Sequence, residues 1–199
     1  MSEAARPRRP VPLASLEYLA GPAPDSRAEI ARRTASVVLA AGRASGPGSG
    51  AERQRILDLV THVGADELAE LWRDSPAESL PGALWALYLL RTWVRDHGGA
   101  VARLYAAGRP GAEVADVIAG VAGLPGPEEV AELADAVLTC AFDGDLADAL
   151  ERAAAFARVV AAGRGFEEEP AQHRLGMGNL HLAERLEQAA KLHRAGRLE

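Results

Sequence analysis

The sequence lacks features on which several classes of protein depend. Its 199 residues include a single cysteine, Cys140, which excludes an internal disulfide framework and is typical of a reducing compartment. No apolar run reaches the roughly 20 residues that span a bilayer. The basic start of the chain is not followed by the apolar stretch of a secretory signal. The sequence therefore predicts a cytoplasmic protein without a membrane segment.

Strand patterns and familiar catalytic motifs are also missing. Apolar and polar residues do not alternate over the length of a strand anywhere in the chain. The glycine-rich segment 45–50 lacks the Lys-Ser or Lys-Thr ending of a phosphate-binding loop. Cys140 has no histidine near it in the sequence, and such a cysteine is most often a small buried hydrophobe. We therefore predict an all-α protein and expect no cofactor and no metal site.

Lysine is scarce, and negative charge is unevenly distributed. Lys191 is the only lysine among 22 basic residues, a bias typical of a GC-rich bacterial genome. The net charge is −6, and residues 111–169 hold thirteen acidic residues against three arginines. An acidic surface repels phosphates, so nucleic acid is not an expected partner there. DNA contacts would fall to the arginines near the start of the chain: Arg6, Arg8, Arg9, Arg27, Arg32 and Arg33.

The most apolar segment lies near the middle of the chain. Residues 80–94 read LPGALWALYLLRTWV, and no charged side chain interrupts residues 83–90. Pro81 suits the first turn of a helix, where its missing N–H is not needed. A helix that is apolar on all sides is normally enclosed by other helices. We therefore predict a single multi-helix bundle around a central apolar helix at about residues 80–97.

Apolar residues at helical spacing fill most of the remaining chain. The clearest helix spans residues 127–142, with Gly126 as its N-cap and Pro127 in its first turn. Asp145 caps the next helix, which extends to Gly163. We also expect a capping box at 26–29, a cap at Asp66, and helices at residues 12–20, 26–41, 51–63, 66–72, 99–107, 112–122 and 179–195.

These elements predict four parts along the chain. The proline- and arginine-rich arm at 1–11 is expected to be disordered. A helical bundle domain follows at 12–163. The segment 164–178, which holds an acidic run, a proline and two glycines, is predicted to be a linker. A C-terminal helix at 179–197 then packs on the bundle or on a partner.

Two acidic pairs suggest one enzymatic alternative. Glu129 and Glu132 lie one helical turn apart, and Asp148 and Glu151 repeat this spacing on the next helix. Together they resemble the Mg²⁺ site of the all-α nucleotide pyrophosphohydrolases, which uses ExxE and ExxD pairs on neighbouring helices. The resemblance implies a Mg²⁺-dependent nucleotide hydrolase. The second pair runs D-x-x-E here and no basic residue lies nearby to hold phosphates, so a solvated helix face explains the spacing equally well.

An aromatic cluster allows two interpretations. Three tryptophans and two tyrosines fall within residues 72–105 of a chain that is only 5% aromatic. They form either a thick core or a surface that meets a partner, because Trp, Tyr and Arg dominate binding hot spots. The candidate partner-binding residues are Trp72, Trp85, Arg91, Trp93 and Arg95, with Leu182 and Leu186 on the last helix.

The absence of a catalytic set favours a non-enzymatic protein-interaction or regulatory role. The expected partner is another protein or a second copy of the chain, which would form a homodimer. Two alternatives stay open: the Mg²⁺-dependent hydrolase, and a DNA-associated regulator that uses the N-terminal arginines.

Overall fold

The computed structural model describes residues 24–43, 64–119, 124–139 and 144–199. Within these ranges the regular structure consists of helices without any strand, which confirms the predicted all-α fold. The expected arm at 1–11 and the helices at 12–20 and 51–63 lie outside the described residues. The described helices are α2 (Pro24–Arg43), α4 (Ala65–Trp72), α5 (Leu80–Asp96), α6 (Gly98–Ala119), α7 (Pro127–Leu138), α8 (Leu146–Gly165) and α9 (Pro170–Arg194).

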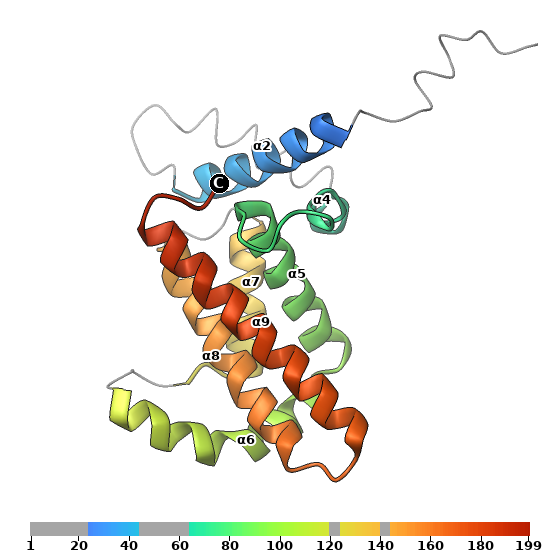
Figure 1. Cartoon of the computed structure of the whole chain (residues 1–199), viewed down its shortest axis with the longest axis vertical. Coiled ribbons are helices and arrows are strands. Elements are labelled where there is room, and N and C mark those ends of the chain that lie inside the picture. Colours follow the sequence, from blue (N-terminus) through green and yellow to red (C-terminus); the bar gives the residue numbers. More distant parts are fainter. Residues whose placement is uncertain (1–23, 44–63, 120–123, 140–143) are drawn as a thin grey trace, which may run out of the picture.

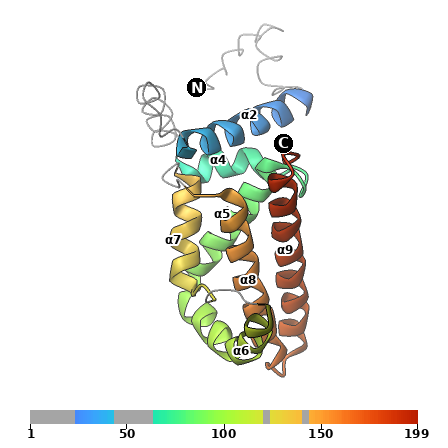
Figure 2. The same cartoon turned by 90° about the vertical axis from the view of Figure 1, so that its left-hand side faces the viewer.

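Four helices form the long body of the molecule. α5, α7, α8 and α9 run along its length, while α2 lies across one end and α6 across the other (Figures 1 and 2). α5, predicted as the central helix, contacts every other described helix. None of the described helices combines the length and hydropathy needed to cross a membrane.

α8 is the most completely enclosed helix of the body, packed against both α6 and α9. Its buried face consists mainly of alanine and valine, and these small side chains let the neighbouring helices approach closely. Gly108 of α6 and Gly163 of α8 meet at one crossing. A Cβ atom on Gly108 would overlap the Val159 carbonyl, and one on Gly163 would overlap the Leu104 carbonyl. The α6–α8 crossing therefore depends on two glycines.

The predicted break between helices 99–107 and 112–122 is wrong. α6 is one helix from Gly98 to Ala119, with Pro110 inside it. The glycine at 108 is used for close approach to α8 and not for a turn. Pro110 removes one backbone donor and its ring crowds the carbonyl one turn earlier, yet the helix continues past it.

The predicted linker at 164–178 is also wrong. α8 continues to Gly165 and α9 begins at Pro170, so only residues 166–169 connect them. Pro170 occupies the first turn of α9, where proline is well tolerated. Gly176 does not break the helix, because it lies against Ala161 and Arg164 of α8, where an added Cβ would be 3.5 Å from either residue.

The helix caps follow the sequence at some ends and differ at others. The Asp145 carboxylate accepts the Ala147 N–H at 2.7 Å, and the Gly126–Pro127 start of α7 is confirmed. The N-cap of α4 is Gly64 at φ 88° instead of Asp66, which lies in the first turn. α2 begins at Pro24, before the expected capping box, and α7 ends at Leu138 instead of 142. Cys140 lies outside the described residues.

Candidate functional site

The four carboxylates of the hydrolase alternative are not brought together. The Glu129 carboxylate accepts the Gly126 N–H at 2.9 Å and so closes the N-terminus of α7. On α8, Asp148 and Glu151 both accept from the Arg194 guanidinium of α9, and this hydrogen bond lowers the pKa of Glu151. Glu132 is exposed. No group of three or more potential metal-ligating side chains occurs among the described residues.

The arginines of α2 are already paired with acidic groups of the same chain. Arg27 lies 3.7 Å from Asp74, and Glu29 accepts from both Arg32 at 2.8 Å and Arg33 at 2.7 Å. A phosphate backbone would have to compete with these carboxylates. The other candidate DNA-contacting residues, Arg6, Arg8 and Arg9, lie outside the described residues.

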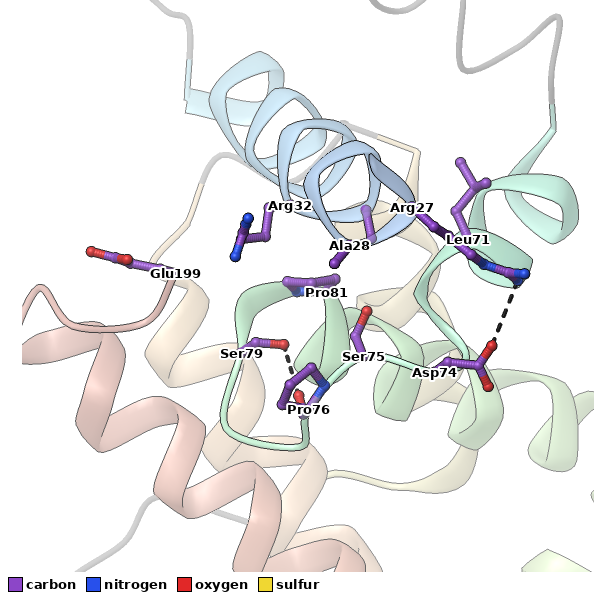
Figure 3. A pocket seen from close by; sticks show the side chains of 11 residues that line it. Arg27, Ala28, Arg32, Leu71, Asp74, Ser75, Pro76, Ser79, Pro81 and Glu199 are labelled. Atoms are coloured by element: carbon purple, nitrogen blue, oxygen red, sulfur yellow. Dashed lines mark hydrogen bonds and ion pairs between the residues drawn. The ribbon is translucent and has the colours of Figure 1, made fainter. Parts of the chain in front are cut away.

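A pocket of about 460 Å³ lies where α2, the α4–α5 turn and the C-terminal residues meet. Figure 3 shows Arg27 reaching Asp74 at its rim, with Pro81 and Ala28 near its centre. The Glu199 carbonyl accepts the Leu80 N–H at 2.8 Å, which holds the C-terminal residues beside the start of α5. Since both of its arginines pair with carboxylates within the chain, this pocket leaves no cation unmatched for an anionic ligand.

Two of the predicted partner-binding residues are core residues. The Trp72 side chain is fully buried and its indole N–H donates to the Thr34 hydroxyl at 3.0 Å. Leu186 is buried against the bundle. Neither offers surface to a partner in this fold.

The two α5 arginines that were predicted to bind a partner instead link α5 to α7. Arg91 and Arg95 both donate to the Asp135 carboxylate, which binds them from the neighbouring helix. Trp85 is half-buried and stacks on Tyr88 with ring centroids 5.4 Å apart, and the Arg73 guanidinium carbon lies 6.0 Å from the centroid of its ring. These residues are engaged with their own chain.

The remaining two predicted residues, Trp93 and Leu182, lie together in a groove of about 410 Å³ between α5 and α9. Both are half-buried. Leu89 and Leu175 add strongly exposed apolar surface, at 45% and 52% exposure. We refer to this feature as the α5–α9 groove; its lining residues are Leu89, Leu90, Trp93, Arg164, Arg174, Leu175, Gly178, Asn179, Leu182 and Arg185.

Arg164 is the one buried charged residue among those described. Its guanidinium carbon lies 5.4 Å from the centroid of the Trp93 ring, in a cation–π contact. Its Nε donates to Asn179 at 3.0 Å and its Nη1 to Gln172, both of which are neutral amides. Burial lowers the pKa of Arg164, with the charge of Glu167 opposing that shift. A desolvated cation whose direct contacts are two amides and an aromatic ring is suited to an acidic group from outside.

Two exposed arginines extend this positive charge along the groove. Arg174 and Arg185 make no ion pair or hydrogen bond with any described residue, and the groove lining contains no acidic side chain. Sequence reasoning missed Arg174 because 164–178 was predicted as a linker, and it missed Arg185 because nothing in the sequence shows that this arginine lacks an acidic partner. Once α9 is known to begin at Pro170, the spacing of Leu175, Leu182 and Arg185 places them on one helical face.

The structure thus defines an all-α protein whose α5–α9 groove combines apolar surface with unpaired positive charge. Comparisons with models of known protein families, with curated proteins and with solved structures found no significant match to this chain.

Proposed function

We propose that this chain is a non-enzymatic, cytoplasmic protein-interaction or regulatory protein that binds its partner in the α5–α9 groove. The observation that carries the proposal is Arg164, a guanidinium buried beside Trp93 without a carboxylate partner among the described residues. Burying a charge without a direct ion-pair partner destabilises a fold, so an external acidic group that pairs with Arg164 would form a strongly favourable interaction.

The shape and composition of the groove favour a protein partner. α5 and α9 run antiparallel, because the start of α5 lies beside the residues that follow α9. A groove between two such helices suits an amphipathic helix or an apolar loop. Its lining includes Trp93, Arg174 and Arg185, the residue types that dominate binding hot spots. The expected partner surface is therefore apolar and flanked by acidic side chains.

A pair of synthetic peptides tests this function. One is an amphipathic helix with leucines at positions i, i+3, i+4 and i+7 flanked by glutamates, and the other replaces each glutamate by lysine. Fluorescence anisotropy should show that the acidic peptide binds the chain and the basic one does not. The double variant Arg174→Glu/Arg185→Glu should weaken binding of the acidic peptide by roughly tenfold or more, because opposite charges become like charges.

A matched control uses a reversal away from the groove, Arg103→Glu, at an exposed position of α6. Binding of the acidic peptide should be retained by this variant. Equal binding of both peptides, or equal binding by the wild type and the double variant, would show that the groove is not the recognition surface.

A further inference from the structure

The chain itself carries an exposed segment with the acidic side chains that the lining of the α5–α9 groove lacks. Between α8 and α9, residues 166–169 read Phe-Glu-Glu-Glu. Phe166 is 72% exposed, and the three glutamates are also exposed. Glu168 and Glu169 make no ion pair or hydrogen bond through their side chains with any described residue. We refer to residues 166–169 as the acidic turn.

The acidic turn does not reach the middle of its own groove. It is held between the end of α8 at Gly165 and Pro170, the first residue of α9. Leu182 lies twelve residues further along α9, which corresponds to about 18 Å at the rise of an α-helix. The turn therefore projects from one end of the groove, where only Glu167 acts on Arg164 through its charge.

We infer that the occupant of the α5–α9 groove is the acidic turn of a second copy of this chain, in a symmetric homodimer. A two-fold axis at the level of Gly176, about 9 Å along α9 from both Pro170 and Leu182, would set the acidic turn of each copy against the groove of the other. Phe166 of one copy then covers Leu182 and Trp93 of the other. Its glutamates then face Arg185 of the other copy, which explains why these charges are unpaired within one copy.

This inference deepens the proposed function by naming the partner, and it rests on the groove being a protein-binding surface. Self-complementarity favours the second copy over an unrelated acidic protein. The apolar, basic groove and the apolar, acidic turn are neighbours along the chain, since the groove residue Arg164 precedes the turn and Arg174 follows it, and a two-fold symmetric contact requires such complementary surfaces in one copy.

Charge reversal on each side tests the inference. In the groove variant, Arg174→Glu/Arg185→Glu, the groove and the turn are both acidic. In the turn variant, Glu168→Arg/Glu169→Arg, both are basic. Sedimentation velocity should show a dimer for the wild type and a monomer for each variant alone, with a dissociation constant raised by roughly tenfold or more. Circular dichroism and thermal unfolding check that both variants keep the wild-type fold.

Mixing the two variants gives the decisive result. In a mixed dimer the acidic groove meets the basic turn, and the native groove meets the native turn, so both contacts become attractive again. An equimolar mixture should therefore recover the dimer. A double reversal at Arg103→Glu/Arg152→Glu, at exposed positions of α6 and α8, should leave the wild-type dimer unchanged.

Three results would overturn the homodimer. The first is a wild-type protein that stays monomeric at about 100 μM, a concentration at which dimers of micromolar affinity form. The others are charge-reversal variants that remain dimeric and an equimolar mixture of them that stays monomeric. A wild-type monomer that still binds the acidic peptide through Arg174 and Arg185 would leave the proposed function standing. If neither binding of the acidic peptide nor self-association depended on Arg174 and Arg185, both the homodimer and the proposed function would be wrong.

Discussion

Trp72 and Arg164 are both nearly enclosed, yet their polar groups are satisfied in different ways. The Trp72 indole has one donor and finds one acceptor, the Thr34 hydroxyl. Arg164 carries a charge that its amide partners do not neutralise. Trp72 therefore serves stability, whereas Arg164 is the residue on which the proposed recognition role rests.

We expect Trp72→Phe to lower the free energy of unfolding by about 1 kcal/mol, since it removes one buried hydrogen bond and some packing. Trp72→Ala should cost about 3–5 kcal/mol, because it also leaves a cavity between α2, α4 and α5. Urea titration followed by circular dichroism measures both. Trp85→Phe, at a half-buried position, is the control and should cost less than Trp72→Phe. An unchanged stability in Trp72→Ala would contradict its place in the core.

Gly178 offers a way to fill the groove without disturbing the fold. A Cβ at this position meets no atom within 4 Å. Gly178→Ala should therefore stabilise α9 by about 0.5–1 kcal/mol, because glycine is unfavourable inside a helix. Gly178→Trp should keep the fold and block the groove, so that acidic-peptide binding and self-association are both lost. Thermal unfolding and anisotropy check the two effects, and full peptide binding by Gly178→Trp would exclude the groove as the site.

At the scale of helices, the α6–α8 crossing sets how closely the body packs. Gly163→Ala should destabilise the fold by about 1–3 kcal/mol or more, because the new methyl group overlaps the Leu104 carbonyl and the helices must separate. Gly165→Ala in the same helix is the matched control, since nothing lies within 4 Å of its added Cβ. Chemical denaturation should rank Gly165→Ala as near neutral or stabilising, and similar losses in both variants would argue against a specific close contact.

The link between α8 and α9 should respond to acid. A hydrogen bond from Arg194 holds the pKa of Glu151 below its ordinary value of 4.5. A carboxyl group with a lowered pKa in the folded state stabilises the fold above its ordinary pKa, and this contribution is lost as the pH falls through the lowered value.

We therefore expect Glu151→Gln to be less stable than the wild type near pH 7, by less than about 1 kcal/mol because the pair is exposed. The difference should shrink below pH 4.5, the ordinary pKa, and vanish in stronger acid. Urea titrations of both proteins across this range measure it. A difference that is constant with pH would show that the ion pair contributes nothing through its charge.

The helices that sequence could predict are those whose periodicity or caps are local signals. The start of α7 at Gly126–Pro127 and the cap at Asp145 are of this kind. The continuity of α6 through Gly108 and the early start of α9 depend on contacts with α8, which local patterns do not encode.

The same reason limits prediction of the candidate site. Trp93 and Leu182 were found because tryptophans and helical leucines stand out in the sequence. Arg164 was missed, because only tertiary packing buries it and places it over the Trp93 ring.

At the scale of the whole molecule, charge is separated onto neighbouring surfaces. The chain has a net charge of −6, yet its α5–α9 groove presents arginines without acidic residues. The acidic turn lies next to this groove at the α8–α9 connection. In the proposed homodimer, opposite charges on adjacent parts of one surface would steer two copies into a defined orientation.

Zero-length cross-linking most directly tests whether the acidic turn of one copy lies in the α5–α9 groove of another. Lys191 is the only lysine in the chain, so few other amines can react. Arg185→Lys keeps the positive charge and adds one amine, which a carbodiimide couples only to a carboxylate in direct contact. Mixing ¹⁴N- and ¹⁵N-labelled protein identifies links between copies by mass spectrometry. We predict mixed-isotope peptides that join Lys at position 185 to Glu167, Glu168 or Glu169. Absence of that link, or equal linkage from Arg103→Lys on α6, would contradict a groove occupied by a second copy.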